Sequence, residues 1–369
     1  MSKLRLSAVF CVLAYLQVMT GSAVHALPPL GITTLGKSSL TSKLSIVQGK
    51  AYVSTINGHY FVVDSAGSVS VINVTHPSLG SFGTLSKPVE ALDGEIYFVA
   101  SNRDLPATGG ALYHIDAPDS PLRTWEGPYF IGGVDQNLRV FGDRSETLID
   151  GTALWFNPNS TATGLLPTGS FTGNTRVNSV TPNGYILGGW QEPGTEEYLS
   201  AYWDPDGNFY RDDSFSLTIQ DRADGKGINI GSGPDSVKYG DLDPIKIVDR
   251  DESSLFGGEV LLSQTNFTLI RASGRFTWAY YPGVVPENPD AAVRIKELFP
   301  ELADFPLNNG IWDLFAVDGR IYMTFVEDGT AYLFGARDPS LGDVPEPSSL
   351  CCLAIATLVA GVVNRRRNG

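Results

Sequence analysis

The 369-residue chain contains very little cysteine and histidine. All three cysteines lie close to its ends, at Cys11, Cys351 and Cys352. Residues 27–350 therefore form no disulfide and offer no thiol nucleophile, so their stability must come from burial and backbone hydrogen bonding. The histidines of this part are far apart in sequence, at His59, His76 and His114. No two of them have the spacing of zinc ligands, and we expect no zinc site.

Basic residues are also scarce. The chain has 26 Lys and Arg against 40 Asp and Glu, which gives a net charge of −14. Five of the basic residues lie in the two terminal segments, so the middle of the chain is more acidic than the whole. Such a surface repels nucleic acid and anionic lipid, and we expect no nucleic-acid partner. No Gly-x-Ser-x-Gly motif is present to indicate a serine hydrolase.

Alternating apolar and polar residues, broken by turn dipeptides, fill the middle of the chain. Residues 51–56 and 59–64 flank Asn57-Gly58, and residues 321–326 and 330–335 flank Asp328-Gly329. These are strong signals of two-residue β-hairpins, because such turns need positive φ. The pattern predicts an all-β protein.

The hairpin pattern recurs along the chain. Repeat units begin near Gly49, Gly94, Asn137, Asn183, Gly258 and Gly319. The first three intervals are 45, 43 and 46 residues, close to the length of about 40–50 residues of a propeller blade. We therefore predict a β-propeller of about six or seven blades over residues 27–337.

Three further features belong to this prediction. The long fourth interval has room for a degenerate blade within residues 214–249. Residues 289–299, preceded by Asn288 and followed by Pro300, are the best helix candidate, since proline suits the first turn of a helix. Residues 32–35 can supply the missing outer strand of the last blade and close the ring.

Two of the units follow a longer template. In one, Gly184-Tyr185-Ile186-Leu187-Gly188 leads to Ala201-Tyr202-Trp203-Asp204-Pro205-Asp206-Gly207; in the other, residues 137–142 lead to Ala153-Leu154-Trp155-Phe156-Asn157-Pro158. The template resembles the HAF-type repeats of exported bacterial proteins. This resemblance also implies a propeller-like array. Aligning the two units on this template matches Trp155 of one with Trp203 of the other.

The N-terminus has the features of an export signal. Lys3 and Arg5 precede an apolar stretch over residues 6–19. Val24-His25-Ala26 then offers small residues at the two positions that signal peptidase reads. We predict a signal peptide over residues 1–26, cleaved between Ala26 and Leu27.

The C-terminus has three parts. Val344-Pro345-Glu346-Pro347 leads, through Ser348-Ser349, into the apolar residues 350–363, and residues 364–369 include Arg365, Arg366 and Arg367. The apolar run is short for a spanning helix, and the arginines are costly to move across a bilayer. The combination resembles the PEP-CTERM sorting signal. This resemblance implies recognition by an exosortase, a membrane protease of bacteria, with a transmembrane anchor before processing. Residues 338–343 would link the propeller to the signal.

Candidate sites for chemistry are few. The turn Asp204-Pro205-Asp206-Gly207-Asn208 can bind calcium through its oxygens, or can simply be the turn of the repeat. The acidic residues Asp241, Asp243, Asp249, Asp251 and Glu252 can form a metal site, a catalytic carboxylate pair or a solvated loop. Residues 224–233 are rich in glycine, and we interpret them as a flexible loop. We assign no catalytic residue, no metal ligand and no other cofactor.

Six tryptophans are spread at about one per unit: Trp125, Trp155, Trp190, Trp203, Trp278 and Trp312. Packing between blades is their expected role, and a platform for sugars is the alternative. The favoured hypothesis is an exported envelope or matrix protein, processed by signal peptidase and exosortase, whose non-catalytic propeller binds a polysaccharide or a surface partner. The alternative is a propeller glycosidase or lyase acting on extracellular polymer. Carboxylates clustered at the ring centre would favour the enzyme.

Overall fold

The structure is a computed structural model. It describes residues 25–38, 41–76, 80–81, 83–102, 109–145, 151–170, 172–195, 198–211, 217–222, 225–232, 236–238, 245–246, 259–264, 267–271, 278–282, 293–305, 307 and 311–339. The C-terminal sorting motif, the apolar run 350–363 and the three terminal arginines lie outside these residues. So does the predicted signal peptide, apart from His25 and Ala26.

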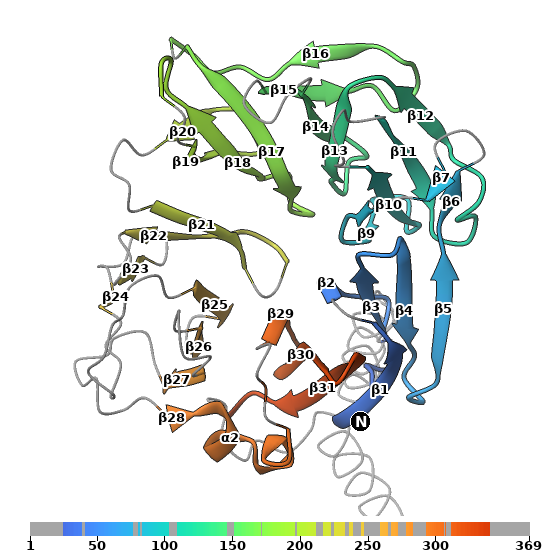
Figure 1. Cartoon of the computed structure of the whole chain (residues 1–369), viewed down its shortest axis with the longest axis vertical. Helices are drawn as coiled ribbons and strands as arrows, with labels where there is room; N and C mark the ends of the chain where they lie inside the picture. The colour runs from blue at the N-terminus through green and yellow to red at the C-terminus, as the bar shows by residue number, and fades with distance from the viewer. Residues whose placement is uncertain are drawn as a thin grey trace, which may run out of the picture.

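Seven antiparallel sheets of the described residues stand around a ring (Figure 1). We number these sheets as blades in chain order. The strands of blades 1 and 2 are β2 (Thr41–Val47), β3 (Lys50–Thr55), β4 (His59–Val63) and β5 (Val69–Asn73), then β8 (Thr84–Leu85), β9 (Val89–Glu90), β10 (Ile96–Ser101), β11 (Gly109–His114) and β12 (Arg123–Glu126). A small hairpin joins these two blades, formed by β6 (Thr75–His76) and β7 (Gly80–Ser81).

Blades 3, 4 and 5 each have four strands in chain order. They are β13 (Tyr129–Val134), β14 (Val140–Ser145), β15 (Gly151–Phe156) and β16 (Thr163–Leu165); β17 (Asn174–Val180), β18 (Ile186–Gln191), β19 (Tyr198–Trp203) and β20 (Phe209–Arg211); and β21 (Leu217–Asp221), β22 (Ile228–Ser232), β23 (Ser236–Lys238) and β24 (Ile245–Lys246). In each blade the first strand lies nearest the ring centre and the last lies outermost (Figure 1). The degenerate blade expected within residues 214–249 is therefore confirmed as blade 5.

Blades 6 and 7 complete the ring. They contain β25 (Glu259–Gln264), β26 (Phe267–Arg271), β27 (Trp278–Pro282) and β28 (Val293–Arg294), then β29 (Ile311–Val317), β30 (Arg320–Glu327) and β31 (Thr330–Arg337). The helix predicted over residues 289–299 is confirmed only over Ile295–Leu298 among the described residues. Val293 and Arg294 pair with β27, and α2 is only Ile295–Leu298, followed by a 3-10 turn at Pro300–Leu302. Sheet pairing has overridden local helix propensity here.

The two ends of the propeller meet in blade 7. Strand β1 (Gly31–Lys37) pairs antiparallel with β31 and supplies the outermost strand of that blade, as predicted for residues 32–35. Just before it, the carbonyl oxygen of Pro28 accepts hydrogen bonds from Tyr322 Oη at 2.7 Å and Arg320 Nη1 at 3.2 Å. The first and last strands of the domain are thus joined by a sheet ladder and by side-chain hydrogen bonds.

The repeating turns mark one place in each blade. Gly49, Asn137, Asn183 and Gly319 lie in the turn between the first and second strands of blades 1, 3, 4 and 7. The predicted unit starts are therefore one strand late, because the turn residues are more regular than the inner strands before them. Gly258 is out of phase with the others, since it directly precedes the inner strand β25.

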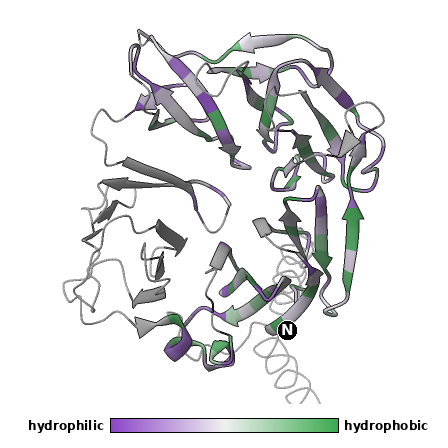
Figure 2. Cartoon of the chain, in the orientation of Figure 1, coloured by the Kyte–Doolittle hydropathy of each residue, from purple (hydrophilic) through white to green (hydrophobic). Residues whose placement is uncertain are grey.

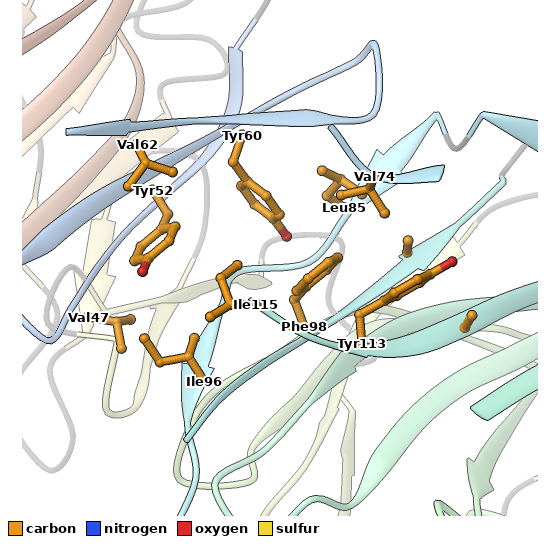
Figure 3. Close-up of a cluster of buried hydrophobic side chains, with 12 residues drawn as sticks. Val47, Tyr52, Tyr60, Val62, Val74, Leu85, Ile96, Phe98, Tyr113 and Ile115 are labelled. Atoms are coloured by element: carbon orange, nitrogen blue, oxygen red, sulfur yellow. The ribbon is translucent and has the colours of Figure 1, made fainter. Parts of the chain in front are cut away.

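Buried side chains fill the spaces between neighbouring blades. Between blades 1 and 2, Tyr60 meets Phe98 edge-on at 5.3 Å, and Phe98 stacks on Tyr113 at 5.2 Å (Figure 3). The hydroxyl of Tyr60 donates to the carbonyl oxygen of Ser86 at 2.7 Å, which satisfies its polar end. Hydrophobic and hydrophilic segments succeed one another along strands such as β17, as expected for strands that bury alternate residues (Figure 2).

Glycines of the repeat template allow close strand contact. Gly142 and Gly188 occupy equivalent positions on β14 and β18, opposite bulges in the inner strands β13 and β17. A Cβ at Gly142 would overlap the carbonyl oxygen of Phe130, and a Cβ at Gly188 would overlap that of Arg176. The template therefore requires glycine because the inner strand bends toward it.

Replacing this glycine tests that explanation. Gly188→Ala should lower the free energy of unfolding by about 1–3 kcal/mol, because the strand must shift to admit the methyl group. Gly83→Ala is the matched control, since a Cβ there meets its nearest atom at 3.5 Å. Urea unfolding would measure both variants. Equal stability of the two would contradict the steric role.

Candidate functional site

A cluster of charged side chains lies at the ring centre. Lys87 lies between the inner strands β8 and β9 of blade 2, Asp221 ends the inner strand of blade 5, and Asp313 lies on the inner strand of blade 7. Lys87 Nζ is 3.5 Å from Asp221 Oδ2 and 3.2 Å from Asp313 Oδ2, and all three side chains are mostly buried. One lysine therefore links three blades across the ring.

The cluster sets one cation against two carboxylates. Burial by itself would lower the pKa of Lys87, but the carboxylates of Asp313 and Asp221 outweigh burial and raise it. Asp313 Oδ2 also accepts a hydrogen bond from the backbone N–H of Leu44 in blade 1 at 2.7 Å. Both carboxylates are thus committed to a cation, which differs from an open carboxylate pair that would flank a scissile bond.

A second feature is a cavity of about 440 Å³ between blades 3 and 4. It opens on the face that carries the turn between the first two strands of each of these blades. Phe141, Leu166 and Ile186 contribute apolar lining, and the turn over residues 204–207 of blade 4 forms one wall. Trp155 also lines the cavity, and 40% of its surface is exposed.

The exposure of Trp155 corrects the alignment of the repeats. Val140 pairs with Phe156 in blade 3, and the equivalent Ile186 pairs with Trp203 in blade 4. Trp203 therefore corresponds to the buried Phe156, and Trp155 corresponds to Tyr202. The predicted correspondence of Trp155 with Trp203 was wrong by one residue, and such a slip places a side chain on the opposite face of the sheet.

The residue opposite Trp155 is also distinctive. Trp155 pairs with Gly164, whereas the equivalent Tyr202 pairs with Tyr210 and stacks on its ring at 4.8 Å. A Cβ at Gly164 would overlap the indole of Trp155, so the ring rests directly on the backbone of β16. Blade 3 thus has a glycine against the indole where blade 4 has a second aromatic ring.

An ion pair crosses the wall of the cavity. Arg139 Nε donates to Oδ2 of the fully buried Asp135 at 2.7 Å, and Arg139 Nη1 donates to the carbonyl oxygen of Pro205 at 3.2 Å. Asp135 Oδ1 accepts the backbone N–H groups of Asn137 and Arg139. The charge of Arg139 is therefore balanced within the wall.

The turn predicted as a possible calcium site forms another wall. Asp204 Oδ1 accepts the backbone N–H groups of Asp206 and Asn208, and Oδ2 accepts Asn208 Nδ2 and Tyr210 Oη at 2.9 and 3.1 Å. Partial burial opposes ionisation, but these hydrogen bonds outweigh it and lower the pKa of Asp204. Both oxygens thus serve the turn of the repeat, which is the alternative that the sequence left open.

The other predicted residues have varied positions. The side chains of Trp125, Trp190 and Trp203 are buried, as expected for packing residues.

Ala26 is exposed, whereas Leu27 packs against the core between blades 7 and 1. The flexible loop expected over residues 224–233 is wrong in part, because Ile228–Ser232 forms β22 through its alternating isoleucines. The acidic residues between 241 and 252 lie outside the described residues.

The charged cluster at the ring centre was not found from the sequence, whereas Trp155 and the turn over residues 204–207, which line the cavity, were candidates. Lys87, Asp221 and Asp313 are separated by up to 226 positions, and no motif links them. Within the described ranges, no group of three His, Cys, Asp or Glu side chains could hold a metal ion. The helices in those ranges are all too short or too polar to span a membrane.

The order and pairing of the seven sheets define a β-propeller. No family model and no curated protein matches the chain. Among solved structures, hydrazine synthase from Kuenenia stuttgartiensis is similar with a TM-score of 0.49 and 10% identity, over 87% of this chain and 99% of that chain. The surface component PorZ of the type-IX secretion system of Porphyromonas gingivalis has a TM-score of 0.45 and 12% identity, over 79% of this chain and 46% of that chain. The Dos1 propeller has a TM-score of 0.40 and 13% identity, over 80% and 77%.

Removing the central lysine tests its role. Lys87→Met should lower the free energy of unfolding by about 3–5 kcal/mol, because two mostly buried carboxylates lose their cation. Lys37→Met is the control, since Lys37 is exposed and its Nζ donates a hydrogen bond to Thr330 Oγ1, and it should change stability by less than about 0.5 kcal/mol. Urea unfolding near pH 8 would measure both.

The pH dependence of the same variant follows from the raised pKa of Lys87. The stabilisation from the charged lysine is fully present below its unfolded pKa of 10.5 and is lost as the pH rises through the higher folded value. The stability difference between the wild type and Lys87→Met should therefore shrink above pH 10.5. A difference that stays constant to pH 12 would count against the ion pairs.

Proposed function

We propose that the chain is an exported protein of the bacterial cell surface or extracellular matrix, sorted by an exosortase, whose propeller binds an extracellular polymer or a surface partner without catalysing a reaction. The N-terminal segment up to Ala26 and the C-terminal segment from Val344 would direct export and sorting. Residues 27–337 would be the displayed domain.

The arrangement at the ring centre carries the non-catalytic part of this proposal. A propeller glycosidase needs one carboxyl group that donates a proton and a second carboxylate that acts as base or nucleophile. Asp221 and Asp313 converge at the centre, but both contact Lys87 Nζ. Both carboxylates are therefore engaged with a cation of the chain itself, and this geometry supports a non-catalytic role.

The position of the first folded residues supports the predicted cleavage point. Ala26 is exposed, Leu27 is partly buried, and the carbonyl of Pro28 is held by Tyr322 and Arg320. Removal of residues 1–26 would therefore leave these contacts of the ring intact. A cut a few residues later would remove them.

The mass of the mature protein tests the sorting proposal. In a strain with the sorting protease, the C-terminus should be cut near residues 344–347, and in a strain without it residues 350–369 should remain. Glu346→Ala should abolish the cut, whereas Asp343→Ala, just outside the motif, should leave it unchanged. The same C-terminus in both strains would overturn the proposal.

A further inference from the structure

We propose that the cavity between blades 3 and 4 is a carbohydrate-binding site for uncharged pyranose units of a polysaccharide, with the indole of Trp155 as its platform. This inference rests on the proposed function of a surface-displayed binding protein, and it names the class of ligand. It goes beyond the fold, because the site is built from residues particular to blades 3 and 4.

The platform is the first argument. A large aromatic ring that is 40% exposed and lines a cavity of about 440 Å³ can stack on the apolar C–H face of a pyranose. The indole is fixed from beneath by Gly164. Stacking on it would therefore cost little conformational entropy.

The polar groups at the cavity suit hydroxyl groups. Asn157 lines the cavity, and its Oδ1 accepts the N–H of Asn159 at 2.8 Å, which orients the amide and leaves Nδ2 as a donor for a ligand. Asn137 and Asp206 also line the cavity and are exposed. A few such groups around an apolar surface give orientation and specificity, as small-ligand sites require.

The charges select against acidic sugars. Arg139 is the cation of the cavity wall, and Asp135 already neutralises it. Asp204 stays ionised because its pKa is lowered, and Asp206 is an exposed carboxylate beside it. The cavity therefore carries excess negative charge on a chain whose net charge is −14, and a uronate would be repelled.

The equivalent positions in the neighbouring blades are occupied by protein groups. In blade 4, Tyr210 covers Tyr202. In blade 2, the equivalent His114 is 2.8 Å from Glu95 and packs edge-on against Tyr97 at 5.4 Å. Trp155, in contrast, has a glycine as its partner on the outer strand and lines the cavity.

Affinity electrophoresis of the full-length protein tests the site. The gels would contain the neutral polymers dextran, hydroxyethyl cellulose or galactomannan, or the acidic polymers polygalacturonate or alginate. We expect at least one neutral polymer to retard the wild type and neither acidic polymer to do so. Trp155→Ala should weaken binding at least tenfold, and Trp155→Tyr should retain part of it. Leu122→Ala is the matched control, since it removes another exposed apolar side chain, on blade 2, and should bind like the wild type.

A further variant moves the indole without removing it. Gly164→Val should also weaken binding, because its side chain occupies the place of the ring, while circular dichroism confirms that each variant is folded. Asp206→Asn should reduce the exclusion of polygalacturonate. The proposal is overturned if Trp155→Ala binds like the wild type, if acidic polymers bind better than neutral ones, or if no polymer is bound. Surface display, measured by cell fractionation, remains a separate readout, so loss of glycan binding with intact display would overturn this inference alone.

Discussion

The pairing of β1 with β31 is the constraint on which the structure depends. No disulfide can hold residues 27–350 together, so the ring is closed by a sheet ladder between the start and the end of the domain. Each blade buries its faces only against its neighbours, and an open ring would expose two of them. Hydrogen bonds from Tyr322 and Arg320 to the carbonyl of Pro28 strengthen the same junction.

The closed ring has two sites with different chemistry, one at its centre and one between blades 3 and 4. At the centre, the inner strands meet, and Lys87 pairs with both Asp221 and Asp313 in a mostly buried cluster. Such a cluster is costly to form, and its loss would leave uncompensated charge. Between blades 3 and 4, the wider outer region leaves a cavity beside Trp155.

Much of the fold was predictable because its signals are local. Asn57-Gly58 and Asp328-Gly329 specify hairpins through positive φ, and the turn interval of about 45 residues indicates blades. The helix predicted over residues 289–299 is reduced to Ile295–Leu298 in the described residues, because Val293 and Arg294 pair with β27 instead. The repeat alignment failed at Trp155 because a turn of different length shifts the register by one residue, which no composition pattern reveals.

The sequence by itself determined the all-β class, the approximate number of blades and the strand that closes the ring. These follow from residue alternation, turn chemistry and spacing, which act over a few positions. Only the tertiary structure decided that Lys87 joins Asp221 and Asp313, and that Trp155 is exposed while Trp203 is buried. These outcomes depend on which strands become neighbours and on which face each side chain projects from, and both are set by packing across the whole ring.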